Sequence, residues 1–446
     1  MSNRIWFVMT LAFFAACQPA EKKEAPDFLA ADIDTTVSPA QDFFSYANGT
    51  WIKNNPIPSD QSGWGVGELV QEDIYNRLRV INEKALTDTT QAGSISQKIG
   101  DFWYSGMDSD DIEKQGLKPL QADFSAIDKI TTIPDLIKET AVLQNKGVNV
   151  LLGEDISQDE KNSDKIVFHI YQGGLGMGNR DYYFNTNEKT LKVRAAYKLY
   201  QYKAFRSMGK DSVSATVAAN SVYDLETKLA KASRKLQDLR DPDSNYHKMD
   251  VSSLQKLYFK IGWNDLFNSS GIKSLDSVIV GQPEFLTALN TEITKTSLDV
   301  WKNYLSFHLL MHSAVYLDST NFYNIFSYFQ ARSGVEKPKP RWKRVLDAEE
   351  SAMGEALGQL FVKENFNEKT KQRYSDLVEA IRGAYKDRIM KLSWMSDSTK
   401  QKALLKLSKV TKKVGYPDKW KDFSALVIDR GPWVLNVQRA AEWWTN

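Results

Sequence analysis

The sequence predicts a mainly α-helical protein with one small β-hairpin. Apolar residues recur at helical spacing through most of the chain, whereas short β-branched and aromatic runs occur together in a single region. The chain has 446 residues, and 42% of them are hydrophobic. Since single hydrophobic cores stop growing at about 250–300 residues, this length predicts more than one lobe.

Two apolar stripes predict long helices in the last quarter of the chain. The first stripe consists of Met353, Leu357, Leu360 and Phe361, and the second of Tyr374, Leu377, Val378, Ile381, Tyr385 and Ile389. A third helix is expected to begin at a capping box, Ser398–Gln401, in which the serine accepts a backbone N–H and the glutamine reaches back. Gly415 can end this helix, and Pro417 prevents its return.

One region has the pattern of strands. Val148–Leu152 and Ile166–Tyr171 are short runs separated by the polar segment Ser157–Asp164, and they predict a hairpin packed against the helices. The four glycines of Gln172–Gly178 predict an irregular turn. Their spacing matches neither a dinucleotide-binding fingerprint nor a Walker A loop, so we reject a phosphate-binding interpretation.

The N-terminus has the pattern of an export signal. A basic start, Met1–Arg4, precedes the apolar run Ile5–Ala16, which is too short to span a bilayer. Small residues before Cys17 resemble a bacterial lipobox, so residues 1–17 are predicted to be a lipoprotein signal peptide with Cys17 as the lipidated residue. The alternative is an ordinary signal peptide with an incidental cysteine. In both cases we expect export, and without a second cysteine the chain can form no intramolecular disulfide.

The rest of the chain is expected to divide into a tether and a globular body. Residues 18–38 are polar and rich in proline and alanine at their start, which predicts a flexible tether, and residues 39–446 are predicted to be globular. The 58 basic and 56 acidic residues give a net charge of +2. This balance argues against nucleic acid as a partner, because nucleic acid requires a basic face.

The residues alone identify no catalytic set. His308 and His312 are one helical turn apart, as a zinc-binding helix requires, but Leu309 stands where the general-base glutamate would follow the first histidine. Their apolar surroundings favour two histidines on a packed helix. We expect His169 in a strand and His247 in a turn, without companions at ligand spacing. Carboxylates are too plentiful for counting to exclude a glycosidase.

An ordered series of short motifs extends over roughly residues 38–446. It comprises Asp42–Trp51, Asn55–Pro58, Lys98–Trp103, Gly116–Leu120, Gly173–Gly176, Arg180–Tyr183, Leu239–Pro242, Pro340–Arg344, Gly354–Gly358 and Gly415–Trp420. Together these motifs resemble the neprilysin family of zinc metallopeptidases, in its bacterial endopeptidase branch. Each motif alone is weak, and the specificity lies in their order along the chain.

The resemblance implies a two-lobed fold, in which a multi-helical lobe caps a thermolysin-like catalytic lobe and peptides are hydrolysed in the cavity between them. Residues 39–446 would supply the N-terminal, substrate-capping lobe, truncated before the catalytic lobe, which is absent from this sequence. The zinc motif of the family, His-Glu-x-x-His, does not occur. The resemblance therefore implies zinc in the complete metalloendopeptidase, and a chain that alone has no catalytic or metal-binding residue, binds no zinc and is inactive.

The resemblance also implies partners and candidate contacts. Arg341, Lys343 and Arg344 are possible substrate-cavity residues, although ion pairs or a solvated face are their more ordinary roles. The implied partners are peptide substrates, the missing C-terminal catalytic domain, and a membrane reached through the lipid anchor in the periplasm or at the cell surface. Two other hypotheses remain open. One is a lipid-anchored peptide-binding protein without catalysis, and the other is a zinc site at His308 and His312 with unrelated ligands.

Overall fold

The structure is a computed structural model that describes residues 28–88 and 92–445. The chain divides into two compact units, with the boundary between Pro58 and Ser59. The predicted signal peptide, its Cys17 and the first part of the predicted tether lie outside the described residues. Within the described ranges, no helix combines the length and the hydropathy needed to cross a bilayer.

The first unit contains the helices α1 (Phe28–Asp32) and α2 (Phe43–Asn54). The loop that joins them is tied to α2 through Asp34, which is buried and whose carboxylate lies 2.6 Å from the ammonium group of Lys53. The described part of the predicted tether, residues 28–38, contains α1 and this ion pair.

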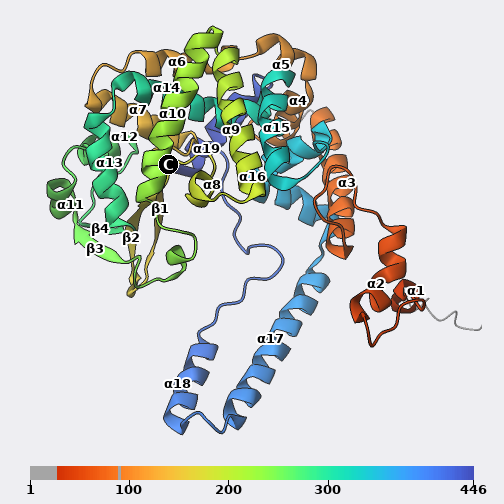
Figure 1. Cartoon of the computed structure of the whole chain (residues 1–446). Coiled ribbons are helices and arrows are strands. Elements are labelled where there is room, and N and C mark those ends of the chain that lie inside the picture. The colour runs from red at the N-terminus through yellow and green to blue at the C-terminus, as the bar shows by residue number, and fades with distance from the viewer. Residues whose placement is uncertain (1–27, 89–91, 446) are drawn as a thin grey trace, which may run out of the picture. The chain divides into compact units, whose positions relative to one another are not determined.

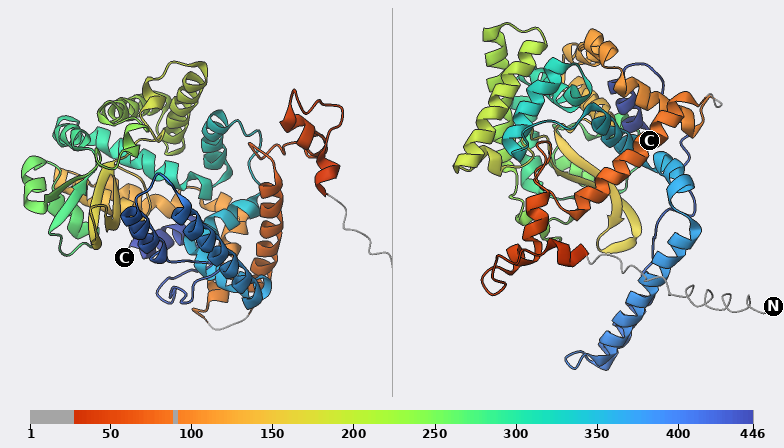
Figure 2. Two further views of the ribbon diagram at one scale, coloured as in Figure 1. Left: turned by 90° about the horizontal axis from the view of Figure 1, so that it is seen from below. Right: turned by 90° about the vertical axis from the view of Figure 1, so that its right-hand side faces the viewer.

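The second unit is built mainly from helices, in agreement with the predicted fold class (Figures 1 and 2). Its α-helices are α3 (Val66–Thr87), α4 (Ile95–Met107), α5 (Ser109–Gln115), α6 (Gln121–Asp128), α7 (Ile133–Asn145), α8 (Asp181–Phe184), α9 (Glu188–Ser207), α10 (Ser212–Ala232), α11 (Val251–Leu257), α12 (Trp263–Ser269), α13 (Pro283–Lys295), α14 (Leu298–Ser313), α15 (Ser319–Ser333), α16 (Arg341–Asn365), α17 (Glu368–Lys391), α18 (Asp397–Ser408) and α19 (Trp433–Thr445). Short 3₁₀ helices lie at Lys118–Leu120, Asp238–Arg240 and Ala314–Tyr316.

Helices α16 and α17 confirm the two long helices expected from their apolar stripes, whereas α18 differs from its prediction. Ser396, and not Ser398, caps α18 by accepting a backbone N–H. The helix ends at Ser408, so the expected extension to Gly415 is wrong. The residues that follow include the β-branched Val410, which is 52% exposed, so no burial offsets its lower helix propensity.

Four strands form one mixed sheet in the order β1-β2-β4-β3. They are β1 (Leu152–Asp159), β2 (Asn162–Gln172), β3 (His247–Asp250) and β4 (Ser277–Val280). Strands β1 and β2 form an antiparallel hairpin, which confirms the predicted hairpin. Strand β4 pairs with β2 in parallel and with β3 in antiparallel fashion, so β1 and β3 are the outer strands.

The hairpin is longer than predicted and shifted along the chain. Strand β1 begins where the first predicted strand, Val148–Leu152, ends, because the backbone at Leu151 has a positive φ of 60° that breaks the extended run. Most of the polar segment expected between the strands belongs to β1 and β2. The pattern did not predict β3 and β4, and His247 begins β3 instead of lying in a turn.

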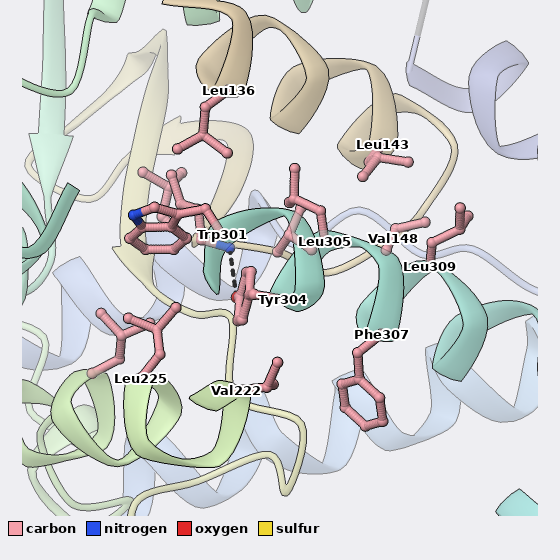
Figure 3. Close-up of a cluster of buried hydrophobic side chains, with 14 of the residues drawn as sticks. Leu136, Leu143, Val148, Val222, Leu225, Trp301, Tyr304, Leu305, Phe307 and Leu309 are labelled. Carbon is pink, nitrogen blue, oxygen red and sulfur yellow. Dashed lines mark hydrogen bonds between the residues drawn. The ribbon is translucent and has the colours of Figure 1, made fainter. Parts of the chain in front are cut away.

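Two hydrophobic clusters fill the second unit. The larger one surrounds α14, whose side chains meet those of α7 and α10. In Figure 3, Trp301, Tyr304 and Leu305 of α14 lie between Leu136 of α7 and Leu225 of α10. The smaller cluster joins α3, α4, α16 and α19. The lobes expected from the chain length therefore take the form of two cores within one compact unit.

Candidate functional site

The three predicted cavity cations lie in the first turn of α16 but do not share one environment. The Lys343 side chain is only 9% exposed, and its Nζ lies 2.5 and 2.6 Å from the carboxylate oxygens of Glu72 on α3. This buried ion pair joins two helices of the smaller core, so Lys343 is not available to a ligand. Arg341 and Arg344 lie about one turn apart, and each has a backbone carbonyl as its hydrogen-bond acceptor.

Arg344 lines a cavity of about 330 Å³ with aromatic walls. Its Nε donates to the carbonyl of Lys339 at 3.2 Å, and its guanidinium carbon lies 3.9 Å from the centre of the Phe322 ring. Burial, and to a lesser degree the charge of Arg341, lower the pKa of Arg344 to about 10, so it remains a cation at neutral pH. The other lining residues are Val315, Tyr316, Phe326, Phe329, Pro338, Asp347, Ala348, Ser351 and Trp433.

The other charged residues that line this cavity, Lys339 and Asp347, pair with each other. Lys339 Nζ lies 2.8 Å from Asp347 Oδ2 and 2.9 Å from Tyr75 Oη, and the Tyr75 hydroxyl donates to Asp347 Oδ1 at 2.5 Å. Burial and the bond to Asp347 raise the pKa of Tyr75, so the phenol stays protonated. Arg344 therefore supplies the charge that this cavity can offer to a ligand. The arrangement can hold an anionic group attached to an apolar body.

The described residues include no group of three or more His, Cys, Asp or Glu side chains that could hold a metal ion. His308 is buried on α14, and its Nε2 lies 2.8 Å from Oε1 of Glu226 on α10. His312 lies one turn further along; burial lowers its pKa, and its Nε2 has no partner among the described residues. The hypothesis of a zinc site at His308 and His312 therefore lacks a third ligand, and these residues do not fit zinc.

The glycine-rich turn is a structural element built around Glu226. The carboxylate of Glu226 accepts from the Tyr197 hydroxyl at 2.8 and 2.9 Å, from the Tyr183 hydroxyl at 3.0 Å, and from the N–H of Gly176 at 3.3 Å. A Cβ at Gly176 would overlap the Tyr197 hydroxyl, and Gly174 has a φ of +71° beside the backbone of residue 151. Close packing explains these glycines, which agrees with the rejection of a phosphate-binding loop.

Helices α17 and α18 carry an exposed apolar stripe. Neither helix has a buried residue. The exposed apolar residues of α17 are Tyr374, Leu377, Ile381, Tyr385 and Met390, which are between 48% and 58% exposed. Trp394 in the connection is 76% exposed, and Leu405 of α18 is 61% exposed. The segment after α18 is tied to α17 by the ion pair of Lys412 with Glu379, at 2.9 Å, and Figures 1 and 2 show α17 and α18 as a hairpin of helices. Exposed apolar side chains on one helix pair are typical of a surface that binds another protein surface.

A family model described as peptidase family M13 matches residues 39–417. The chain belongs to peptidase family M13. This M13 chain is 30% identical over 402 residues to Endothelin-converting enzyme 1 of Rattus norvegicus, and 30% identical over 412 residues to Neprilysin-3 of Drosophila melanogaster. Each alignment covers 86% of this chain and 52% of the relative, so the chain spans about half the length of these relatives. The predicted resemblance to the neprilysin family is confirmed.

Solved structures agree with this assignment. The crystal structure of the zinc metalloprotease Zmp1 of Mycobacterium tuberculosis in complex with an inhibitor matches with a TM-score of 0.86 and 29% identity, over 93% of this chain and 63% of that one. PepO of Lactobacillus rhamnosis, at 16% identity, shares the fold with a TM-score of 0.79, over 92% of this chain and 66% of that one. The fold of this M13 chain is therefore that of the mainly α-helical N-terminal lobe of the family.

Among the predicted site residues of this M13 chain, the structure brings Arg341 and Arg344 together and separates Lys343 from them. Helical geometry predicts this separation. Successive residues of a helix are about 100° apart around its axis, so Arg341 and Arg344 share a face and Lys343 does not. The role of Phe322 was missed, since nothing in the sequence connects α15 with the start of α16. Cys17, the predicted lipidation site, lies outside the described residues and remains a prediction.

Proposed function

We propose that this M13 chain is the N-terminal, substrate-capping portion of a zinc-dependent endopeptidase that hydrolyses peptides in a cavity between two lobes. The observation that carries the proposal is the apolar stripe on α17 and α18. A helix of 24 residues with no buried side chain gains little stability from its apolar face, because helices in proteins are stabilised mainly by packing that face. A second lobe packed on the stripe would supply this burial.

In this proposal, the residues that hold zinc belong to the other lobe. The chain alone then binds no zinc and cuts no peptide, and its part is to enclose the substrate. The length of the relatives, of which this chain covers 52%, supports a second lobe of similar size. The predicted signal peptide and Cys17 support an exported protein that a lipid anchor holds at a membrane.

Peptidase assays of the purified chain test this proposal. With quenched fluorescent peptides, the hydrolysis rate is expected to equal the buffer blank both with added zinc and with a chelator. Zinc-dependent cleavage that co-purifies with the chain through successive columns, and is the same in independent preparations, would contradict the proposal.

A second candidate function, lipid-anchored peptide binding without catalysis, is favoured by the aromatic cavity at Arg344. It requires measurable peptide affinity in the presence of a chelator. It also requires a chain that is complete in itself, with little binding of apolar dyes. The capping proposal requires strong dye binding, because the surface for the other lobe is uncovered.

The double substitution Leu377→Lys and Ile381→Lys is expected to lower the fluorescence of the apolar dye ANS by about half, because both side chains belong to the exposed stripe. The midpoint of thermal unfolding should hardly change, since neither side chain is buried. The matched control is Val213→Lys with Val217→Lys on α10, which are 74% and 63% exposed outside the stripe. An equal fall in dye fluorescence for both variants would show that the stripe is not a distinct surface.

A further inference from the structure

A second cavity lies at the free edge of the sheet. It has a volume of about 910 Å³, within the range of small-ligand and peptide sites. It is lined by the first half of β1, by the segment 144–149 that leads into this strand, by Phe168 of β2, by the loop 270–275 and by the end of α19. Since β1 is an outer strand, one side of its backbone has no partner strand within the described part of the chain.

Three polar atoms of side chains that line this cavity are buried without a hydrogen-bond partner among the described residues. They are Oε1 of Glu154, Oε1 of Gln144 and Oγ of Ser270. The amide of Gln144 is fixed in orientation, because its Nε2 donates to the carbonyls of residues 150 and 152 at 3.1 Å. A buried polar atom without a hydrogen-bond partner carries a desolvation penalty, and a ligand that donates a hydrogen bond to it would remove that penalty.

The cavity is acidic and contains no cation of its own. Among the described residues that line it, Glu154 and Asp155 are the titratable ones. The two lysines of the flanking segments are not available, because Lys146 pairs with Asp123 at 2.5 Å and Lys273 does not line the cavity. The charge of the site therefore complements a positively charged group.

The two acids differ in their environment because neighbouring residues of a strand point to opposite faces. Glu154 lies opposite Ile170 of β2, on the face that joins the larger core, whereas Asp155 lies opposite His169 and is exposed. Burial, with no compensating positive charge, raises the pKa of Glu154 to about 7. A buried carboxylate without a partner is the group that gains most from a cation.

We propose that this cavity binds an extended peptide along the free edge of β1, with a lysine or arginine side chain of that peptide placed against Glu154. An edge strand offers backbone N–H and C=O groups to an added strand, which gives affinity, and a pocket for a side chain gives specificity. Glu154 supplies the charge, and the oxygens of Gln144 and Ser270 accept further N–H donors of the ammonium or guanidinium group. The peptide as ligand class rests on the proposed function, whereas the preference for a basic side chain rests on the cavity alone.

Calorimetric titration of the whole chain tests this proposal with two peptides of blocked termini, acetyl-Val-Thr-Val-Lys-Val-Thr-amide and the same peptide with norleucine for lysine. At pH 8 with a chelator present, the lysine peptide is expected to bind at least about 10-fold more tightly, the equivalent of one charge-assisted hydrogen bond. Glu154→Gln, which keeps the shape and removes the charge, is expected to abolish this difference. The matched control Asp164→Asn, an exposed residue of β2 that does not line the cavity, should change the affinity by less than about 2-fold.

The pH provides a second readout. The carboxyl of Glu154 is ionised above a pKa of about 7. Lowering the pH from 8 to 6 should therefore weaken the affinity for the lysine peptide by about 10-fold and leave the affinity for the norleucine peptide unchanged. Equal affinities for the two peptides, or a lysine preference that survives Glu154→Gln in a variant with unchanged circular dichroism, would overturn the proposal. Binding is measured without hydrolysis, so a failure of the proposed peptidase function would not affect the result.

Discussion

Replacing Glu226 by alanine is expected to lower the free energy of unfolding by about 4 kcal/mol, the usual cost of removing one partner from a buried charged network. Glu226 is fully buried on α10. Its carboxylate accepts from Tyr183 and Tyr197 and from Gly176 N–H, and it lies 2.8 Å from His308 Nε2. Burial and Glu226 raise the pKa of both tyrosines far above the ordinary value, so they remain donors that would lose their acceptor together.

Urea denaturation followed by circular dichroism measures this effect. The matched control is Asp224→Ala on the same helix, because Asp224 is exposed and is expected to change the free energy of unfolding by less than about 0.5 kcal/mol. The loss of stability in Glu226→Ala should be accompanied by higher mobility of the glycine-rich turn, measured as faster amide hydrogen exchange around Gly176. Equal stabilities of the two variants would mean that the network does not hold the turn.

Replacing Glu349 by glutamine is expected to raise the free energy of unfolding by about 3 kcal/mol at pH 7. Glu349 is fully buried on α16, and neither carboxyl oxygen has a hydrogen-bond partner among the described residues. Burial raises its pKa from 4.5 to about 8. Each pKa unit is worth about 1.4 kcal/mol, and about two and a half units separate pH 7 from the unfolded pKa.

The sign of this effect follows from the direction of the shift. The folded protein holds the proton of Glu349 more tightly than the unfolded chain does, so this group causes stability to fall as the pH rises from 4.5 to about 8. Glutamine removes that slope, and the two proteins should be closest in stability near pH 4. Glu350→Gln is the matched control, since Glu350 is the exposed neighbour on the same helix. If the free energies of unfolding of Glu349→Gln and the unchanged protein differ by the same amount at every pH, the raised pKa of Glu349 is contradicted.

The helices were largely predictable from the sequence because their signals are local. The stripe from Tyr374 to Ile389 fixes α17, and a stripe at helical spacing fixes the second half of α16. The start of α18 was placed two residues late, because Ser396 and Ser398 are both acceptable caps and the choice depends on local geometry. Strands β3 and β4 were missed, because four-residue strands give little pattern and depend on partners that are distant in the sequence.

The candidate site was predictable only in part. Arg341, Lys343 and Arg344 were all predicted as possible substrate-cavity residues, and of the three Arg344 lines the aromatic cavity. The pairing of Lys343 with Glu72 joins positions more than 200 residues apart and leaves no trace in either segment. A signal for Glu226 did exist: on α10 it stands among Val222, Leu225 and Leu229, where an acid interrupts an apolar face. Such an interruption indicates a buried polar group that needs partners, although it does not identify them.

In the proposed function, this M13 chain is the capping half of a two-lobed zinc peptidase, and the exposed stripe on α17 and α18 is the surface for the other half. The sharpest test is to read the gene beyond the codon for Asn446. We expect an open frame that encodes His-Glu-x-x-His and, further on, a glutamate ligand. A stop codon directly after Asn446 would contradict it, and would favour peptide binding without catalysis as the function of the chain.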